Sequence, residues 1–172
     1  LSAAAVGIIK GLNLIEISQA LKNYSPPSGR MRLIYGIKNT YIIDDTYNAN
    51  PLSVKSALDT LSGLNGNRKI AIFADMLELG GNSEQLHKDI GNYIAAKKID
   101  LLITVGELSR YIAYGAKDSG MKASNIYDVT SKKEAADLLN RVAKPDDILL
   151  FKGSRLTKME ELINCFTTSY IR

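Results

Sequence analysis

Apolar residues along the chain follow two alternating patterns. Continuous apolar runs, which are typical of buried strands, occur at residues 70–74, 101–105, 126–129 and 148–151. Around these runs, apolar residues recur at the spacing of amphipathic helices, at residues 54–64, 86–94, 108–116, 135–142 and 159–166. Continuous apolar strands that alternate with amphipathic helices indicate a mostly parallel sheet with helices on both faces.

The start of this domain has a different pattern, which predicts a hairpin. Leu33, Tyr35 and Ile37 alternate with their neighbours, and Lys38-Asn39 can turn the chain into the apolar run at 41–43. Helix caps are predicted at Asn50 before Pro51, at Asn82 with Gln85, at Ser131 with Glu134, and at Thr157 with Glu160. We therefore expect an α/β fold, a Rossmann-like doubly wound sheet that is mostly parallel and has an antiparallel hairpin at its start.

Residues 1–27 do not fit this alternation. Apolar residues at 3–9 and 15–21 predict two short helices, and a linker rich in Pro and Ser follows at 25–29. Helices this short cannot bury enough surface to be stable alone. We interpret residues 1–27 as the tail of a preceding domain and 28–172 as the α/β domain. The N-terminus also lacks an initiator Met and a basic leader, which indicates a piece of a longer protein rather than a signal peptide.

Composition narrows the class of protein. The chain has 172 residues, of which 45% are hydrophobic and 23% charged, as expected for one domain and a short extra piece. No apolar run approaches the roughly 18 residues that span a bilayer. One Cys and one His exclude a disulfide framework, argue against a metal site, and suit the cytoplasm. The net charge of +4 is too dispersed to indicate nucleic acid, but it is compatible with an anionic small molecule.

The glycines lack both standard phosphate-binding motifs. None of the 13 glycines is followed by Lys, and no two are separated by a single residue. The Gly-Lys-Ser/Thr loop and the Gly-x-Gly dinucleotide motif are therefore both missing. Any nucleotide would have to bind this chain without either of these loops.

Polar residues gather where three of the predicted strands end, which is where such sheets bind ligands. The three junctions are residues 44–51 (DDTYNANP), 75–81 (DMLELGG) and 152–155 (KGSR). A carboxylate in the first can accept from ribose hydroxyls, and the cations of the third suit a carboxylate or phosphate. Each junction can equally be structural, as a capped turn, a buried loop and a surface loop. His87 is interpreted as solvent-facing or as a local hydrogen-bond partner rather than a catalytic base.

These junctions, in this order, resemble the Mur ligases of peptidoglycan synthesis. The resemblance includes Ser53 and Ala57-Leu58 after the first junction, His87 after the second, Met159-Glu160 after the third, and Gly29-Arg30 after the linker. It covers essentially the whole chain. Within the family, the Asp-Asn-Pro-Arg and Tyr-Ala-His motifs of the ligase that adds meso-diaminopimelate or lysine are absent. This favours the member that adds D-alanyl-D-alanine.

The resemblance implies a three-domain enzyme, with a UDP-sugar-binding N-terminal domain, a central ATPase domain and this Rossmann-like C-terminal domain. ATP and magnesium would phosphorylate the terminal carboxylate of a UDP-N-acetylmuramoyl-tripeptide. The amine of D-alanyl-D-alanine would then attack the acyl phosphate. The phosphate loop, the magnesium ligands and the activating lysine would lie in the central domain, so this chain alone would be inactive.

The resemblance also implies roles for individual residues. Arg30 would reach the ATP phosphates across the domain interface, and Asp45 would bind the ribose. Asn48 and Asn50 would hold adenosine or order their loop. The D-alanyl-D-alanine side is assigned to Asp75, Glu78, Ser154 and Arg155. No catalytic or metal-binding residue is expected within this chain.

A function from another class also fits the residues. The chain could be a free-standing α/β module that binds a nucleotide or a cell-wall peptide without catalysis. A Gly-Lys-Thr segment in the upstream reading frame would exclude this alternative. A small dehydrogenase or methyltransferase would need a Gly-rich first turn, which the chain lacks.

Overall fold

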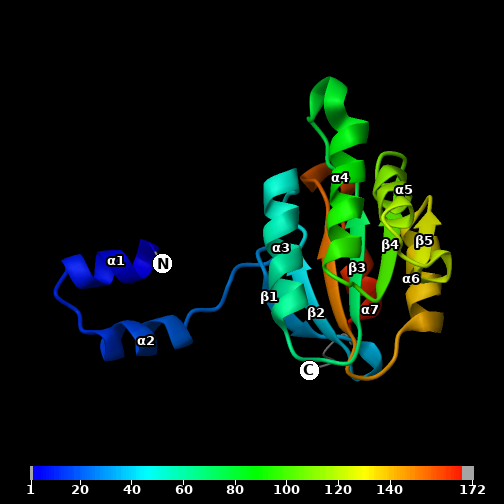
Figure 1. Cartoon of the computed structure of the whole chain (residues 1–172). Coiled ribbons are helices and arrows are strands. Elements are labelled where there is room, and N and C mark those ends of the chain that lie inside the picture. The colour runs from blue at the N-terminus through cyan, green and yellow to red at the C-terminus, as the bar shows by residue number, and fades with distance from the viewer. Residues whose placement is uncertain (1, 168–172) are drawn as a thin grey trace.

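The computed structural model describes residues 2–167, and within them six strands form one sheet (Figure 1). The order across the sheet is β1-β2-β6-β3-β4-β5. β1 pairs antiparallel with β2, and every other pair is parallel. The bounds are β1 Arg32–Tyr35, β2 Tyr41–Asp45, β3 Lys69–Ala74, β4 Leu101–Val105, β5 Ile126–Val129 and β6 Ile148–Lys152. The predicted parallel sheet with an N-terminal hairpin is confirmed.

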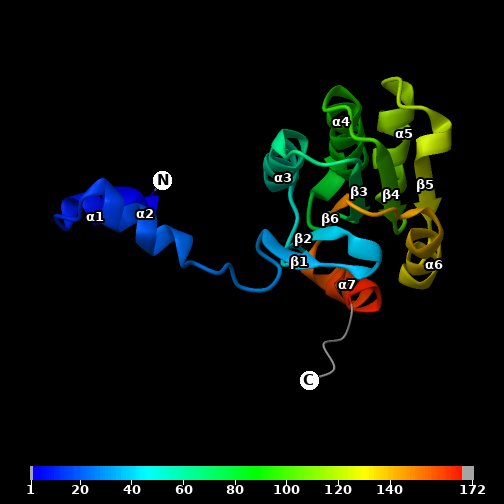
Figure 2. The same ribbon diagram turned by 90° about the horizontal axis from the view of Figure 1, so that it is seen from below.

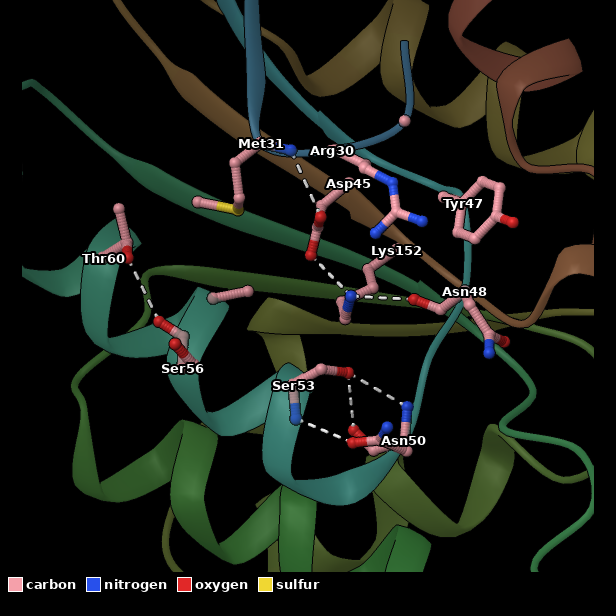
Figure 3. A pocket seen from close by; sticks show the side chains of 12 residues that line it. Arg30, Met31, Asp45, Tyr47, Asn48, Asn50, Ser53, Ser56, Thr60 and Lys152 are labelled. Atoms are coloured by element: carbon pink, nitrogen blue, oxygen red, sulfur yellow. Dashed lines mark hydrogen bonds and ion pairs between the residues drawn. The ribbon is translucent and has the colours of Figure 1, made fainter. Parts of the chain in front are cut away.

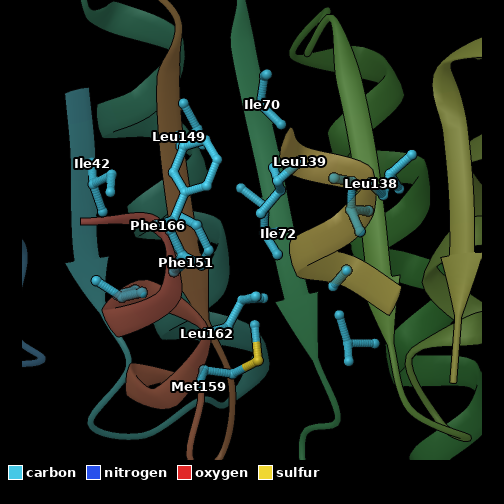
Figure 4. Packing of buried hydrophobic residues seen from close by; sticks show 14 of the residues in the cluster. Ile42, Ile70, Ile72, Leu138, Leu139, Leu149, Phe151, Met159, Leu162 and Phe166 are labelled. Atoms are coloured by element: carbon cyan, nitrogen blue, oxygen red, sulfur yellow. The ribbon is translucent and has the colours of Figure 1, made fainter. Parts of the chain in front are cut away.

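Helices cover both faces of the sheet, as the apolar spacing predicted (Figure 2). α3 (Pro51–Gly63), α4 (Ser83–Ala96) and α5 (Arg110–Asp118) lie on one face, and α6 (Lys132–Val142) and α7 (Glu160–Phe166) on the other. Side chains of the central strand β3 alternate between two cores, with Ile70 and Ile72 facing α6 and α7 (Figure 4) and Ala71 and Phe73 facing the other three helices. Each face of the sheet therefore has its own buried apolar layer.

Two of the four predicted helix caps are confirmed. The Asn50 side chain accepts from the backbone N–H of Ser53 at 2.9 Å, and Ser131 accepts from that of Glu134 at 3.2 Å. The predictions for Asn82 and Thr157 are wrong, because both residues lie in 3₁₀ turns, Gly80–Asn82 and Arg155–Thr157. A capping residue needs an extended backbone, which a 3₁₀ turn does not allow.

Two helices precede the α/β body, α1 (Ser2–Ile9) and α2 (Leu14–Lys22). Both views show them away from the sheet, joined to it by an extended segment (Figures 1 and 2). The helices and the residues next to them expose eight large apolar side chains, which are Val6, Ile8, Ile9, Leu12, Leu14, Ile15, Leu21 and Tyr24. The two short helices are confirmed, and the domain boundary near Ser28 stays a prediction. Among residues 2–167, no helix has the length and apolarity to cross a membrane.

The sheet register brings the three polar junctions together. Asp45 at the end of β2 pairs with Lys152 at the end of β6, and Lys152 in turn pairs with Phe73 near the end of β3. Because these strands are parallel and adjacent, the loops that follow them share one edge of the sheet. We call this edge, where β2, β6 and β3 end, the carboxyl edge.

Candidate functional site

A cavity of about 410 Å³ opens at the carboxyl edge, between the linker at 29–31 and the first turns of α3 (Figure 3). We call it the first cavity. Arg30, Asp45, Asn48 and Asn50 line it, so the structure brings together the four residues expected to bind ATP. Arg30 comes from the linker, Asp45 from the end of β2, and the two asparagines from the loop between β2 and α3.

The buried carboxylate of Asp44 holds the linker in place at Gly29. Asp44, which is 5% exposed, accepts from the backbone N–H of Gly29 at 2.8 Å. Its other oxygen accepts from the Thr46 hydroxyl at 2.7 Å. Gly29 has a φ of 77°, and a Cβ on it would lie 2.9 Å from the backbone nitrogen of Tyr47. Glycine is therefore required where the linker passes over the β2–α3 loop.

The Arg30 guanidinium lies over the ring of Tyr47, 4.0 Å from its centroid. Both residues are exposed, and Figure 3 shows the guanidinium between Tyr47 and Asp45 at the mouth of the first cavity. It forms no hydrogen bond or ion pair with any residue in the described range 2–167. Its N–H donors are therefore available to an anion, while the aromatic ring limits the positions that the side chain samples.

Asp45 forms the floor of the first cavity together with Lys152. The Lys152 ammonium lies 2.5 Å from one carboxylate oxygen of Asp45 and 2.8 Å from the backbone carbonyl of Asn48. The other carboxylate oxygen accepts from the backbone N–H of Met31 at 3.2 Å. Lys152 is only 3% exposed, and a buried ammonium requires such partners because desolvation disfavours the charge.

A second cavity of about 330 Å³ lies on the other side of residues 48–50. Glu78, Ser154 and Arg155 line it, so the structure brings together three of the four residues expected on the D-alanyl-D-alanine side. Asp75 does not line it. The Asp75 carboxylate lies against Gly106 and accepts from the backbone N–H of Ser109 at 2.7 Å, so it connects two loops of the carboxyl edge.

The loop that forms one wall of the second cavity is held by two buried side chains. The Ser154 hydroxyl, 5% exposed, accepts from the backbone N–H of Leu77 at 2.8 Å. His87 accepts from the backbone N–H of Met76 through Nε2 at 3.0 Å. Its proton is therefore on Nδ1, which donates to the Ser83 carbonyl at 2.7 Å. His87 is 0% exposed, so it is a local hydrogen-bond partner and the solvent-facing interpretation is wrong.

Among the described residues 2–167, no group of three or more His, Cys, Asp or Glu side chains is placed to hold a metal ion. The charged groups that line the two cavities are single side chains or pairs. Arg155, for example, is exposed at the second cavity and pairs with Glu160 at 2.7 Å.

Comparison with known proteins decides the family. A family model described as "Mur ligase, glutamate ligase domain" matches residues 29–155, which include the whole lining of the first cavity and all of the second except Leu156. The chain belongs to the Mur ligase family. The resemblance carried by the three junctions is confirmed.

Curated Mur ligases align over nearly the whole chain. The UDP-N-acetylmuramoyl-tripeptide–D-alanyl-D-alanine ligase of Bacillus subtilis (strain 168) is 34% identical over 164 residues, which are 95% of this chain and 36% of that protein. The enzyme of the same name from Escherichia coli (strain K12) is 34% identical, over 95% of this chain and 35% of that protein. The chain thus spans about a third of the length of these relatives.

Solved Mur ligases have the same architecture. A crystal structure of MurF from Acinetobacter baumannii superposes with a TM-score of 0.75 and 30% identity, over 92% of this chain and 34% of that chain. MurC from Thermotoga maritima superposes with a TM-score of 0.64 at 17% identity, over 93% of this chain and 35% of that chain. The second likeness shows the fold alone.

Other residues of the first cavity were not expected from the sequence. Lys152 was noted as a cation of the third junction, but its pairing with Asp45 depends on β6 lying beside β2. The far wall is a row of small and hydroxyl side chains on one face of α3, namely Ser53, Ser56, Ala57 and Thr60. Their spacing along the helix, directly after the first junction, is the signal that could have found them.

Proposed function

We propose that this chain is the C-terminal part of an ATP-dependent ligase that adds D-alanyl-D-alanine to UDP-N-acetylmuramoyl-tripeptide. The first cavity carries the proposal, because it combines a carboxylate with unused acceptor capacity and an unpaired guanidinium in a Mur ligase domain. The names of relatives that are 34% identical over 95% of the chain support the choice of substrates. In this proposal the domain completes the ATP site and helps to place the dipeptide.

The donors and acceptors of the first cavity suit the ribose and phosphates of ATP. Each Asp45 oxygen accepts one hydrogen bond from the protein, so lone pairs remain for ribose hydroxyls. Arg30 at the mouth of the cavity is placed to pair with phosphate, a charge-assisted contact worth roughly 1.5–3 kcal/mol. Asn48 and Asn50 form the wall nearest α3, where Asn50 is committed to its cap.

The reaction then proceeds in two steps, each of which forms one bond and breaks one. The tripeptide carboxylate attacks the γ-phosphorus of ATP, and ADP leaves. The neutral amine of D-alanyl-D-alanine attacks the carbonyl carbon of the acyl phosphate, the C–O bond to phosphate breaks, and the proton that the amine loses passes to the leaving phosphate. Arg30 stabilises phosphate charge, and the cavities hold the reactants in position. Magnesium would be held by ligands in the central domain.

We assign D-alanyl-D-alanine to the second cavity. Arg155 offers a cation for the carboxylate of the dipeptide, and Glu78 offers an acceptor for its amine end. Ser154 lines this cavity, but its hydroxyl already accepts from Leu77, and Asp75 faces another loop. The proposal therefore keeps Glu78 and Arg155 as ligand contacts and assigns Asp75 and Ser154 to the shape of the site.

We also propose that residues 1–27 are the C-terminal tail of the central ATPase domain and pack against the rest of it. The eight exposed apolar side chains in this segment support this, because so much exposed apolar surface is typical of an interface. The parent enzyme would work in the cytoplasm, where ATP is available and where the exposed thiol of Cys165 stays reduced.

The test is a ligation assay on the protein that joins this chain to its preceding domains. We expect ADP and phosphate release that requires both UDP-N-acetylmuramoyl-tripeptide and D-alanyl-D-alanine, and that D-glutamate or meso-diaminopimelate cannot replace the dipeptide. The 172-residue chain alone should show no turnover. Turnover by the isolated chain, or none by the joined protein, would contradict the proposal. Tight nucleotide binding without ligation would instead support the free-standing binding module.

A further inference from the structure

Lys152 has an unusual environment for a lysine that nothing in the proposed reaction requires. It is the last residue of β6, the strand that lies between β2 and β3. Its side chain is 3% exposed, although the ammonium borders the first cavity. Lysine is seldom buried unless its charge is paired. The Lys152 charge is therefore paired, and it lies beside the first cavity.

The contacts of Lys152 all lead to groups that line the first cavity. One N–H of the ammonium donates to Asp45, and another donates to the backbone carbonyl of Asn48. The Asp45 side chain has two rotatable bonds, and its remaining protein contact, with the Met31 N–H, is 3.2 Å long. Lys152 therefore supplies the stronger of the two contacts that fix the orientation of this carboxylate.

Lys152 also determines which cation Asp45 pairs with. The Arg30 guanidinium lies at the mouth of the same cavity and forms no hydrogen bond within residues 2–167 (Figure 3). Without the lysine, Asp45 would pair with Arg30 across the mouth of the cavity, because a partly buried carboxylate attracts a compensating charge. Arg30 would then be withdrawn from the phosphate position.

We propose that Lys152 is a positioning residue of the first cavity. It orients the Asp45 carboxylate so that its free lone pairs face the ribose hydroxyls, and it keeps Arg30 available for phosphate. It also fixes the Asn48 carbonyl, and with it residues 48–50, which separate the two cavities. This inference rests on the proposed function, and it adds a residue that acts through Asp45 rather than by contact with the nucleotide.

The test measures ribose recognition in the joined enzyme, by comparing kcat/KM for ATP with kcat/KM for 2′,3′-dideoxy-ATP. The wild type should prefer ATP roughly 10- to 100-fold, as expected for hydrogen bonds from ribose hydroxyls to a charged acceptor. In Lys152→Met the Asp45 carboxylate is no longer held, so the preference should fall to roughly threefold or less. A purely structural lysine would change stability and leave this ratio unchanged.

A matched control and a second variant complete the design. Lys69→Met makes the same change at the first residue of β3, at the opposite edge of the sheet, and should keep the wild-type ratio. Lys152→Gln leaves a polar group that water can solvate, so it is the variant to use if Lys152→Met does not fold, and it should also lose the preference.

Each result decides between distinct conclusions. A folded Lys152 variant with the wild-type ratio would overturn the positioning role. A wild type that does not distinguish the two nucleotides would overturn the role of Asp45 and that of Lys152 together. A wild type with no ATP-dependent ligation at all would instead count against the proposed function.

Discussion

Strand β6 has a buried ion pair near each of its two ends, and the two pairs differ in what surrounds them. Before β6 begins, Asp147 pairs with Arg68, which precedes β3. At the other end, Lys152 pairs with Asp45 of β2. Both pairs connect residues that are far apart in the sequence, and in each pair one partner is 3% exposed or less.

The Asp147 pair uses nearly all of its hydrogen-bonding capacity within the protein. Its carboxylate accepts from Arg68 at 3.0 Å and 2.6 Å and from the backbone N–H of Lys144 at 2.7 Å. Arg68 also donates to the Val142 carbonyl at 2.8 Å. Within residues 2–167, Asp45 accepts from two protein donors, and it faces a cavity. The same kind of pair therefore closes the sheet at one edge, and at the other it leaves acceptors free for a ligand.

The largest effect on stability is expected at the pair of Asp147 and Arg68. Asp147→Ala leaves Arg68 without its partner and the Lys144 N–H without an acceptor, which should lower the free energy of unfolding by about 3 kcal/mol. This is the low end of the usual range, because the Arg68 side chain is 28% exposed and can be partly solvated. Urea denaturation measures the loss. Asp137→Ala, at an exposed position of α6, is the control and should change stability by about 0.5 kcal/mol or less. If Asp147→Ala lost no more stability than this control, the Asp147 pair would not be the structural pair that we describe.

At the carboxyl edge, Arg30→Ala is expected to have a large effect on activity and little effect on stability. In the joined enzyme, kcat/KM for ATP should fall roughly 10- to 100-fold, because a charge-assisted contact with phosphate is lost. The thermal midpoint should stay close to that of the wild type, since the Arg30 guanidinium lies over the exposed Tyr47 ring and forms no hydrogen bond or ion pair within residues 2–167. Arg32→Ala is the matched control, at an exposed position of β1 outside the first cavity. Equal activities for the two variants would mean that Arg30 has no role at the phosphates.

A smaller and more selective effect is expected from Ser154→Ala. The variant leaves the half-buried N–H of Leu77 without its acceptor and loosens the wall of the second cavity. We expect KM for D-alanyl-D-alanine to rise roughly fivefold, the equivalent of about 1 kcal/mol. KM for ATP should be unchanged, and steady-state kinetics with each substrate varied in turn measures both. Ser124→Ala, at an exposed position that lines neither cavity, should change neither KM value. A parallel rise in both KM values would indicate general loosening of the edge.

The smallest effect is expected at the surface pair of Asp59 and Lys97, which lies at neither end of β6. Hydrogen bonds from Lys97 and then Tyr93 hold the pKa of Asp59 below its ordinary value of 3.8, and they connect α3 to α4. The pKa of Asp59 is lower in the folded state than in the unfolded state. The stability that Asp59 gains from this pair is therefore present above the ordinary pKa, and it is lost as the pH falls through the pKa of the folded state. The thermal midpoint of Asp59→Asn should therefore lie slightly below that of the wild type at pH 7. The difference should narrow below about pH 4, and a gap that persists at low pH would refute this link.

Local patterns were sufficient to predict most of the fold. The strand at 101–105 and the cap at Asn50 depend on residues close together in the sequence, and both are confirmed. His87 was harder, because a lone histidine near a helix start suggests a solvated position. Its spacing to Ile90 and Ile94, which places it on the buried face of α4, was the signal that could have corrected this.

The candidate site depended more on tertiary structure. The carboxyl-end rule brought Asp45, Asn48 and Asn50 into consideration, and the family resemblance added Arg30. The structure places all four on one cavity. Two features depended on strand order and loop path, namely the pairing of Lys152 with Asp45 and the turning of Asp75 toward Ser109. Neither can be inferred from spacing along the chain, because each joins segments that are at least 34 residues apart.

The attachment of the linker has a mechanical consequence. The Gly29 N–H is bonded to Asp44, and the Gly29 carbonyl accepts from the Tyr47 N–H at 3.0 Å, so the chain is fastened to the sheet from residue 29 onward. A hinge between the N-terminal helices and the α/β body must therefore lie before Gly29, in the exposed segment at 23–28. Arg30 then rotates with the sheet as part of one rigid body. Rotation about such a hinge would keep the Arg30 backbone at a fixed distance from Asp45, and would change its distance from anything that the N-terminal helices carry.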